Sequence, residues 1–218
     1  MVKFYDLNIV PQNNTSEKIN ELLTHCFNIG YNGAALSTTS TLLNIGDYDS
    51  KVIFRKNITA QSIGELKNFI RTARDKKILI AVYTQNSSVA NWCASTGLVK
   101  ILSLDLENIK KLQRTTIKLV CENNILFEIS LREMIYNIDH PLVKKISVFS
   151  DKIREILDYK AGLIISSGAS NVFQLRPPRD VIAFANIFSI EEKDAKRALS
   201  TLPEVIFRDY ATVEKGGG

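Results

Sequence analysis

Short apolar runs alternate with helical patterns along almost the whole chain. Eight runs have the length and composition of buried strands, at residues 4–9, 33–36, 52–54, 78–83, 99–103, 117–120, 125–129 and 163–166. Most of them are followed by a stretch with helical spacing, and they are too apolar to face water. This pattern predicts an α/β protein in which helices cover a parallel sheet. Eight such units indicate a TIM-like (β/α) barrel near the lower end of the size range for that fold.

Several helix boundaries can be predicted from capping residues. Thr15 and Ser16 precede the pattern EKINELLTHCFNIG as an N-cap, and Gly30 ends that helix. Ser62, with Glu65 three residues later, has the spacing of a capping box for a helix over 63–77. Ser189 stands in the same relation to Glu192. The stretch 38–50 is predicted to be a loop.

Composition indicates one folded domain. The chain has 218 residues, of which 45% are hydrophobic and 23% charged, which excludes the disordered and low-complexity classes. We expect a single barrel domain over 1–213 and a frayed tail over 214–218. No apolar run approaches the roughly 20 residues of a membrane span, and the N-terminus lacks an apolar signal core. Three cysteines without CxxC spacing favour a reducing compartment, so a soluble, cytoplasmic protein without membrane contact is expected.

The basic residues are concentrated in the middle of the chain. The formal net charge is +5, yet residues 51–118 carry 13 basic and 4 acidic side chains, while the two flanking parts are slightly acidic. A charge excess in one stretch of a folded domain is typical of a protein that binds a polyanion.

One basic stripe lies on the helix predicted over 63–77. Lys67, Arg71 and Arg74 follow at helical spacing, about 110° from the apolar face of Leu66 and Ile70. Together with neighbours such as Lys100 they form a candidate RNA-phosphate surface. A solvated helix face is the alternative interpretation.

A second candidate anion site follows the last predicted strand. Ser167 and Gly168 lie in a small loop at the position where the eighth-strand loops of barrels bind phosphate through backbone N–H groups. Arg176 and Arg179 flank two prolines at the next helix start, where an arginine opposes the helix dipole unless an anion is bound nearby. Alternatively, both arginines pair only with Asp180 or other acids.

Recognisable catalytic motifs are absent from the sequence. His25 and His140 belong to no metal-ligand spacing, and neither a GxSxG elbow nor a glycine-rich phosphate loop is present. Some carboxylates lie in or beside predicted strands, where a barrel enzyme would keep catalytic acids, but strand-end capping explains them equally well. These carboxylates are Asp6, Asp105, Glu107, Glu122 and Glu128.

The C-terminal quarter carries a family resemblance. The segments IISSGA (164–169), LRPPRDV (175–181), SI (189–190), DAK (194–196) and ALST (198–201) closely resemble the ribonuclease P protein component 3 family. This is the barrel-type protein subunit of archaeal and eukaryotic ribonuclease P. FYDLN (4–8), the segment 23–30 and Tyr31 resemble the opening strand and helix of the same family. The chain lacks the C-terminal extension of eukaryotic members, so an archaeal source is expected.

The resemblance implies a barrel related to the polymerase-and-histidinol-phosphatase hydrolases but without their metal-binding histidines. Those relatives begin their ligand set with an HxH at the end of the first strand, where this chain has Asp6-Leu7-Asn8. The implied function is RNA binding as a subunit of the ribonucleoprotein that removes 5′ leaders from precursor tRNA. The implied partners are the ribonuclease P RNA, the small ferredoxin-like ribonuclease P subunit and the other protein subunits, with precursor tRNA reached indirectly. No cofactor is expected on this chain, and Mg²⁺ is expected on the RNA.

Two other hypotheses remain open on sequence grounds. The chain could be a free-standing barrel enzyme acting on a phosphorylated small molecule, with Ser167, Gly168 and Arg176 holding the phosphate and Asp6 as base. It could also be an adaptor without RNA contact. A small-molecule site needs only one or two local cations, and an adaptor needs none. The extended basic excess over 51–118 therefore favours the RNA interpretation.

Overall fold

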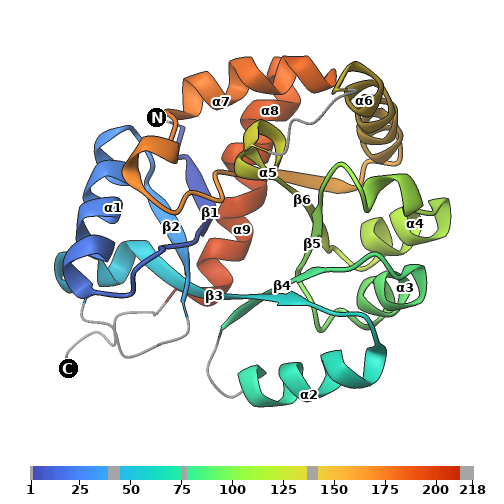
Figure 1. The fold of residues 1–218 in the computed structure, drawn as a ribbon, viewed down its shortest axis with the longest axis horizontal. Helices are drawn as coiled ribbons and strands as arrows, with labels where there is room; N and C mark the ends of the chain where they lie inside the picture. Colours follow the sequence, from blue (N-terminus) through green and yellow to red (C-terminus); the bar gives the residue numbers. More distant parts are fainter. Residues whose placement is uncertain (1, 39–44, 75–77, 137–141, 212–218) are drawn as a thin grey trace.

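Seven parallel strands form one sheet in the part of the chain that the computed structural model describes, residues 2–38, 45–74, 78–136 and 142–211. Their order in the sheet is their order in the sequence (Figure 1). The strands are β1 (Tyr5–Ile9), β2 (Gly33–Ser37), β3 (Val52–Thr59), β4 (Leu79–Tyr83), β5 (Ile101–Leu104), β6 (Leu126–Ser130) and β7 (Gly162–Ser166).

Helices connect the strands and most of them lie on the outside of the sheet, whereas the last helix lies across the barrel (Figure 1). The α-helices are α1 (Ser16–Asn28), α2 (Ile63–Arg74), α3 (Ser87–Thr96), α4 (Arg114–Glu122), α5 (Leu131–Tyr136), α6 (Leu142–Asp158), α7 (Pro178–Ala185), α8 (Glu192–Leu199) and α9 (Thr201–Tyr210). The short 3-10 helices are η1 (Gly46–Lys51), η2 (Ile109–Lys111), η3 (Val172–Gln174) and η4 (Asn186–Phe188).

The sheet curls into a nearly closed barrel. Beyond the strand ends, the first and last strands are joined by backbone hydrogen bonds from Val10 N to Ala169 O (2.8 Å) and from Gln12 N to Ser170 O (3.3 Å). The predicted α/β barrel is therefore confirmed, and the described residues form seven strands where eight were predicted.

The amino end of the barrel interior is apolar and is covered by the last helix. Ile206 and Phe207 of α9 pack into a buried cluster with interior residues of the strands, among them Tyr5, Leu7 and Ile53. The ring of Phe207 lies 5.1 Å from that of Tyr5. A methyl group on Gly33 would lie 2.7 Å from the Tyr5 ring and 2.9 Å from the Phe207 ring, so only glycine allows this close packing.

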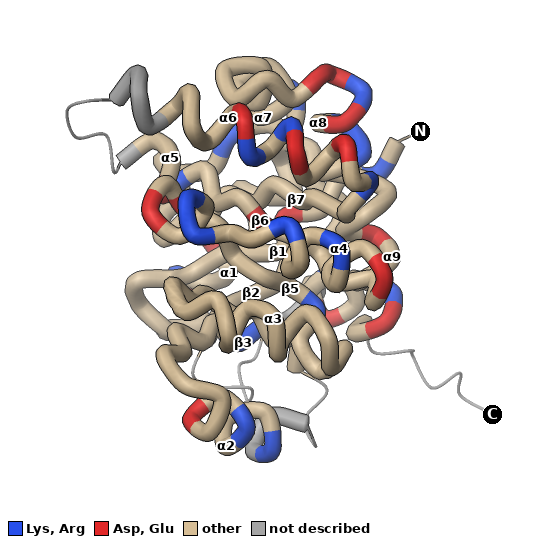
Figure 2. Tube along the Cα trace, turned by 90° about the vertical axis from the view of Figure 1, so that its right-hand side faces the viewer, with Lys and Arg blue, Asp and Glu red and all other residues tan. Residues whose placement is uncertain are grey.

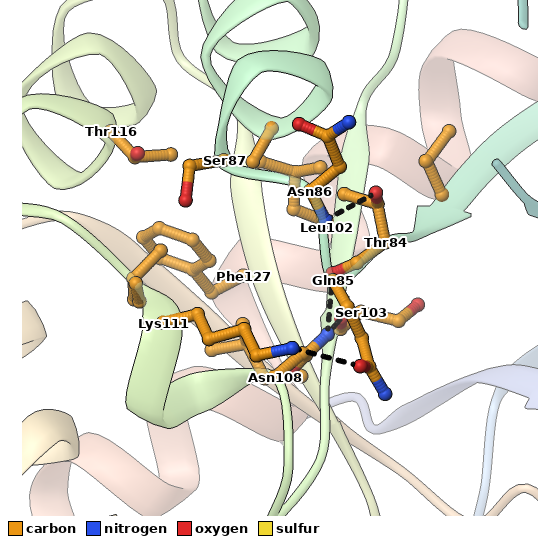
Figure 3. Close-up of a pocket in the computed structure, with 14 residues that line it drawn as sticks. Thr84, Gln85, Asn86, Ser87, Leu102, Ser103, Asn108, Lys111, Thr116 and Phe127 are labelled. Carbon is orange, nitrogen blue, oxygen red and sulfur yellow. Dashed lines mark hydrogen bonds between the residues drawn. The ribbon is translucent and has the colours of Figure 1, made fainter. Parts of the chain in front are cut away.

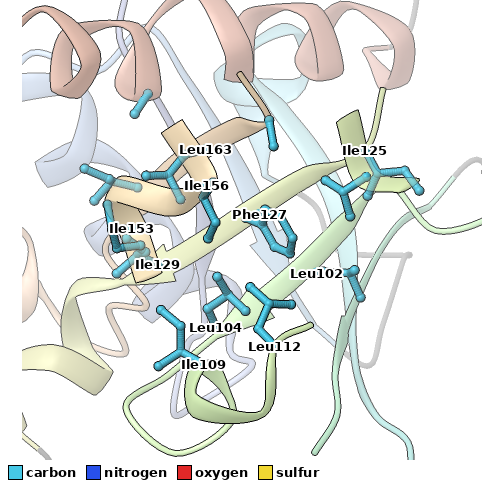
Figure 4. Close-up of a cluster of buried hydrophobic side chains, with 14 of the residues drawn as sticks. Leu102, Leu104, Ile109, Leu112, Ile125, Phe127, Ile129, Ile153, Ile156 and Leu163 are labelled. Atoms are coloured by element: carbon cyan, nitrogen blue, oxygen red, sulfur yellow. The ribbon is translucent and has the colours of Figure 1, made fainter. Parts of the chain in front are cut away.

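The largest core lies between the sheet and the outer helices. Figure 4 shows part of it, where side chains from β5, β6 and β7 meet those of α6 and η2. Phe127 is fully buried there, as are Ile153 and Ile156 of α6. Hydrophobic burial on both sides of the strands explains why the strand sequences are almost continuously apolar.

Two strand predictions differ from the structure. The run 117–120 lies in α4, where Thr116, Ile117 and Val120 are buried on one helix face. A four-residue apolar run does not distinguish a strand from a buried helix segment. The predicted strand 52–54 is instead the start of β3, which continues to Thr59 through Arg55, Lys56 and Asn57.

Capping was predicted correctly at two helices and wrongly at a third. Thr15 Oγ1 accepts from Lys18 N (3.5 Å), and Ser62 Oγ accepts from Glu65 N (3.2 Å). Gly30, at φ +112°, follows the first helix as predicted. Ser189 does not cap α8, because it lies at φ +60° at the end of η4, and Glu191 is the residue before the helix.

The predicted loop 38–50 and the end of the helix predicted over 63–77 are described only in part. Residues 39–44 and 75–77 lie outside the described residues, the helix is described as far as Arg74, and η1 occupies the end of the loop region.

Candidate functional site

The interior of the barrel changes from apolar to polar toward the carboxyl ends of the strands. Side chains two positions apart on a strand share a face, so the residues two positions beyond the apolar layer also point inward. On three strands the step runs from Ile53 to Arg55, from Ile101 to Ser103 and from Leu126 to Glu128. Active sites of barrel enzymes lie at this end of the fold, so the polar layer is the candidate position for reactive groups.

Arg55 and Glu128 dominate the polar layer. The guanidinium of Arg55 on β3 donates to both carboxylate oxygens of Glu128 on β6, with Nη1 to Oε1 at 2.6 Å. Arg55 also donates from Nη1 to the carbonyl of Leu7 (2.6 Å) and from Nε to Asn57 Oδ1 (2.7 Å). Ser103 donates a further hydrogen bond to Glu128 Oε2 (2.8 Å). Both charged side chains are buried, with 0% and 1% of their surface exposed, so each neutralises the other inside the barrel.

An amide network lies next to the ion pair. Asn57 Nδ2 donates to Asn8 Oδ1 (3.0 Å) and to Ser37 Oγ (3.1 Å), and Ser37 Oγ donates to the same Asn8 oxygen (3.1 Å). The network joins β1, β2 and β3 at the mouth of the barrel. The side chain of Asn8, the last residue of the Asp6-Leu7-Asn8 segment, is therefore part of a hydrogen-bonded structural network.

Asp6 is buried beside the loop that follows β7. Its Oδ1 accepts from the backbone N–H groups of Ser167 (3.1 Å) and Asn8 (3.1 Å). Its Oδ2 and the hydroxyl of Ser166 are buried without a hydrogen-bond partner among the described residues. Burial raises the pKa of Asp6 above its ordinary value of 3.8, while the Ser167 and Asn8 hydrogen bonds act in the opposite direction. Asp6 therefore fastens the β7 loop to β1.

The Ser167–Gly168 loop uses most of its backbone donors internally. Ser167 N is bound by Asp6, and Ala169 N donates to Ser167 Oγ (2.9 Å). Ser170 N donates to Gln174 Oε1 (2.8 Å). Gly168 adopts φ +63° and lines a cavity of about 460 Å³ at the barrel mouth, together with Asn8, Asn57 and Glu128. RNA binding by Ser167 and Gly168 stays a prediction. The N–H of Gly168 makes no hydrogen bond to another described residue.

The two predicted arginines do not join that loop. Arg176 Nη1 donates to the carbonyls of Phe173 (2.6 Å) and Leu175 (2.8 Å), so its guanidinium closes the turn η3. The side chain of Arg179 is 96% exposed, and its Nε lies 4.0 Å from Asp180 Oδ1. No hydrogen bond or ion pair within the described chain connects either arginine to Ser167 or Gly168. The structure therefore gives no support to the phosphate-holding group of the small-molecule alternative, which combines Arg176 with that loop.

The predicted basic stripe lies on the outer helix α2. Lys67 and Arg71 are exposed, whereas Leu66 and Ile70 are buried, as the helical spacing predicted. Arg74 is the last residue of the helix, and its side chain lies outside the described part of the structure. Lys67 Nζ lies 5.7 Å from the centre of the Trp92 ring, which fixes its stem against α3. Figure 2 shows the blue positions of α2 at one end of the molecule.

Lys100 lies apart from the β7 loop. It directly precedes β5, and its carbonyl accepts from Leu126 N (3.0 Å), which places it at the amino ends of the strands. Ser167 and Gly168 follow the carboxyl end of β7. The predicted RNA-binding residues are thus distributed over both ends of the barrel, and their RNA contacts stay predictions.

A narrow crevice lies between β4, β5 and the helices that follow them (Figure 3). Asn86 N donates to Thr84 Oγ1 (3.1 Å) and Lys111 Nζ to Gln85 Oε1 (3.0 Å). Asn108 Nδ2 donates to the carbonyls of Ser103 (2.9 Å) and Thr84 (3.3 Å). With a volume of about 30 Å³, the crevice has room for a water molecule but not for a substrate.

The described residues offer no cluster of metal ligands. No group of three or more His, Cys, Asp or Glu side chains suited to a metal occurs among the described residues. His25 is exposed on α1, and His140 lies outside the described residues. Sequence analysis did not place Arg55 and Asn57 in the barrel interior, although they follow Ile53 by two and four positions, which is the spacing of one face of a strand.

Comparison with protein families identifies a match over almost the whole chain. The family model "RNase P subunit p30" matches residues 3–215. Two similar proteins are named ribonuclease P protein component 3. The one from Methanococcoides burtonii is 28% identical over 92% of this chain and 85% of its own length, and the one from Methanosarcina mazei is 24% identical over 94% and 89%. Both are archaeal, in agreement with the expected source.

Comparison with solved structures shows the same fold. A chain of an archaeal ribonuclease P with mature tRNA superposes with a TM-score of 0.75 at 19% identity, covering 97% of this chain and 98% of that one. A Xaa-Pro dipeptidase superposes with a TM-score of 0.63 at 11% identity, covering 99% and 78%. At such identities the superpositions establish the barrel fold and nothing of the chemistry. Within the described residues, no helix is long and apolar enough to cross a membrane.

Proposed function

We propose, from the membership of this chain in the ribonuclease P subunit p30 family, that it is an RNA-binding, non-catalytic protein subunit of ribonuclease P. The chain belongs to that family because the family model spans residues 3–215. The holoenzyme removes 5′ leaders from precursor tRNA. The chemistry of that reaction is assigned to the RNA, and this chain contributes binding surface and a rigid fold.

The buried ion pair between Arg55 and Glu128 at the barrel mouth is the main support for a non-catalytic role. Arg55 and Glu128 occupy the position at which a barrel hydrolase holds its reacting groups, and they are fully occupied with each other and with Leu7 O, Asn57 and Ser103. A carboxylate that receives both hydrogen bonds of a buried guanidinium is a poor metal ligand and a poor general base, because either role would leave a charge uncompensated.

The basic segment supports RNA binding. The excess of cations over residues 51–118 lies partly on α2, where Lys67 and Arg71 are exposed, and Arg179 of α7 is exposed as well. Each phosphate that a Lys or Arg neutralises releases counterions and increases the affinity for RNA. Cations at both ends of the barrel can therefore contact a large folded RNA, whereas a small anion reaches only one of them.

The proposed partners are the ribonuclease P RNA and other protein subunits of the holoenzyme. Among the proteins we assign the direct partner as the small ferredoxin-like subunit, and precursor tRNA as a substrate reached through the RNA. Mg²⁺ is assigned to RNA phosphates, because hard divalent cations prefer phosphate and water oxygens and the described part of this barrel offers no matching cage.

Reconstitution tests the proposal. The RNA and the protein subunits of one source are assembled with and without this chain, and cleavage of a 5′-leader precursor tRNA is measured over a range of Mg²⁺ concentrations. The complete assembly should cleave faster than the assembly without the chain, and the isolated chain should cleave nothing. Cleavage by the isolated chain, together with a stoichiometric transition metal, would overturn the non-catalytic assignment. Equal cleavage with and without the chain would overturn the subunit assignment.

A further inference from the structure

Phe173 is the most exposed large hydrophobic side chain in the described part of the protein. Its side chain is 83% exposed, whereas the other exposed large hydrophobic residues range from 42% to 59%. A single exposed apolar residue is common, but an almost completely exposed aromatic ring on a fixed turn is a frequent feature of binding sites.

The turn that carries Phe173 is held in place from both sides. Phe173 N donates to Asn171 Oδ1 (3.1 Å), and Phe173 O accepts from Arg176 Nη1 (2.6 Å). Leu175 is buried and Val172 packs against the core beneath α1, so the turn is anchored while the ring points outward. Little conformational freedom of this backbone would be lost on binding, which favours affinity.

A cavity of about 240 Å³ lies beside the ring. We call it the η3 pocket, and its lining residues share a mixed polar and apolar character: Pro11, Gln12, Asn13, Lys18, Glu21, Leu22, Ser170, Asn171, Val172 and Phe173. This volume is below the usual range for drug-sized ligands, and suits a single planar group. The amides of Gln12 and Asn13 offer both donors and acceptors at its edge.

These features match an unpaired nucleobase better than a peptide side chain. Base recognition combines an aromatic ring for stacking with polar groups that contact the base edge, and a cation for the adjoining phosphate. Arg179, which is 96% exposed, is a cation six residues further along the chain. An anchor pocket for a protein partner would be lined mainly by apolar groups, whereas six of the ten lining residues here are polar or charged.

We infer that the η3 pocket, with Phe173 as its stacking platform, binds an unpaired base of the ribonuclease P RNA. The inference rests on the proposed function and specifies where an unpaired nucleotide is held. It also gives Arg176 a role as a positioning residue, because its guanidinium closes the turn that presents the ring.

Substitution of Phe173 in the reconstituted ribonucleoprotein tests this inference. Phe173→Ala should weaken binding to the ribonuclease P RNA by about 5- to 150-fold, the range expected for loss of one stacked base, without changing the salt dependence, because no charge is removed. Phe173→Tyr should retain most of the affinity, and Phe173→Leu should not, because only the former keeps the ring. Val205→Ala on α9, which also removes an exposed apolar side chain, is the matched control and should leave the affinity unchanged.

Chemical probing of RNA nucleotides locates the contact. With Phe173→Ala, one or a few unpaired nucleotides that native protein protects should become reactive, while the rest of the footprint persists. Equal RNA affinity and an equal footprint for Phe173→Ala would overturn the inference, as would loss of a protein subunit with RNA affinity intact. If the native protein does not bind the RNA at all, the proposed function itself fails, so the two failures are distinguishable. Because the ring is exposed, the melting temperature of Phe173→Ala should equal that of the native protein.

Discussion

Arg55 and Glu128 form a two-point ion pair across the interior of the barrel, from strands that are separated by two others in the sheet. The pair joins opposite walls at the height where the interior changes from apolar to polar. Because the two buried charges compensate each other, neither can be removed alone at small cost. The same pair lies at the barrel mouth, so the charge compensation there is also part of the stability of the fold.

Removal of one partner of the pair should strongly destabilise the protein. Arg55→Met leaves Glu128 buried and uncompensated, and should lower the free energy of unfolding by about 3–5 kcal/mol. The double variant Arg55→Met with Glu128→Met should be less destabilised than the sum of the single variants. Urea unfolding measures both. Arg114→Met is the control, because Arg114 is exposed in its 2.7 Å pair with Glu155 and should contribute less than about 1 kcal/mol. A cost for Arg55→Met no larger than that of the control would contradict the prediction.

The buried carboxyl of Asp6 should make stability depend on pH. Burial raises its folded-state pKa above the ordinary 3.8, so the folded protein binds this proton more tightly than the unfolded chain. The resulting stabilisation is fully present below the ordinary pKa and is lost as pH rises through the folded pKa. Asp6→Asn keeps an oxygen for the Ser167 and Asn8 amides but removes the charge. Its stability relative to the native protein should therefore increase with pH in urea titrations from about pH 4 to pH 7.

Asp151→Asn on α6 supplies the comparison for that series, because it changes an exposed carboxylate in the same way. The effect of Asp6 is taken as the difference between the two series. A constant difference between Asp6→Asn and the native protein at all pH values would mean that Asp6 does not change its proton affinity on folding.

The sequence was sufficient for the repeating units but not for the polar interior. Apolar runs predicted six of the seven strands closely, because strands buried on both faces are mostly apolar, with few polar residues such as Asp6 or Glu128 among them. Strand β3 was predicted too short, because Arg55 and Asn57 resemble loop residues until the partner of Arg55 is known. That partner, Glu128, is 73 residues away, and only the closed barrel brings the two together. Segment 117–120 shows the opposite error, since its apolar residues form one face of α4.

The sequence indicated which residues of the candidate site are exposed and basic, but not which residues lie next to one another. Helical spacing placed Lys67 and Arg71 on an exposed face correctly. The grouping of Arg176 with the Ser167 loop stays a prediction, and nothing in the sequence indicated that its guanidinium binds carbonyls of its own turn. Local hydrogen bonds of this kind depend on the turn geometry, which neither composition nor periodicity encodes.

The α2 stripe should contribute phosphate contacts. Replacing Lys67, Arg71 and Arg74 together by Ala should weaken RNA binding and reduce its log–log salt slope by about 0.7–0.9 for each phosphate that is no longer neutralised. The melting temperature should change little, because Lys67 and Arg71 are exposed. The matched control replaces three exposed cations of α8, Lys193, Lys196 and Arg197. An equal change of the salt slope in both triple variants would mean that the effect comes from net charge alone. The α2 residues would then form a solvated helix face without phosphate contacts.

Arg176 and Arg179 should differ when each is replaced by Ala. Arg176→Ala removes two hydrogen bonds that close η3 and should lower both the melting temperature and RNA affinity, with a stability loss of about 1–3 kcal/mol. Arg179→Ala should lower RNA affinity alone, because its side chain is 96% exposed. Melting curves and RNA titrations on the same samples separate the two effects. If both variants lose stability but keep their RNA affinity, neither arginine contacts the RNA.

Replacement of Gly168 by Ala should destabilise the protein for two separate reasons. It adopts φ +63°, where any L-residue is strained, and a methyl group added to it would collide with Ser130 Oγ. Gly97 adopts nearly the same angle, +64°, but a methyl group there meets nothing within 4 Å. Gly97→Ala should therefore report the backbone cost alone, about 1–2 kcal/mol, and Gly168→Ala that cost plus the crowding. Urea unfolding of both variants measures the difference.

Removal of the Ser130 hydroxyl distinguishes crowding from backbone strain at Gly168. In Gly168→Ala combined with Ser130→Ala, the nearest obstacle is gone and Arg132 Cβ, at 3.1 Å, becomes the closest atom to the new methyl group. The double variant should then approach the cost of Gly97→Ala, so that Ser130→Ala partly rescues Gly168→Ala. Because Gly168 also lines the barrel-mouth cavity, RNA affinity of the rescued protein gives an independent readout. If Gly168→Ala costs no more than Gly97→Ala, the β7 loop relaxes away from β6, and the tight packing of Gly168 against Ser130 is not a constraint on the fold.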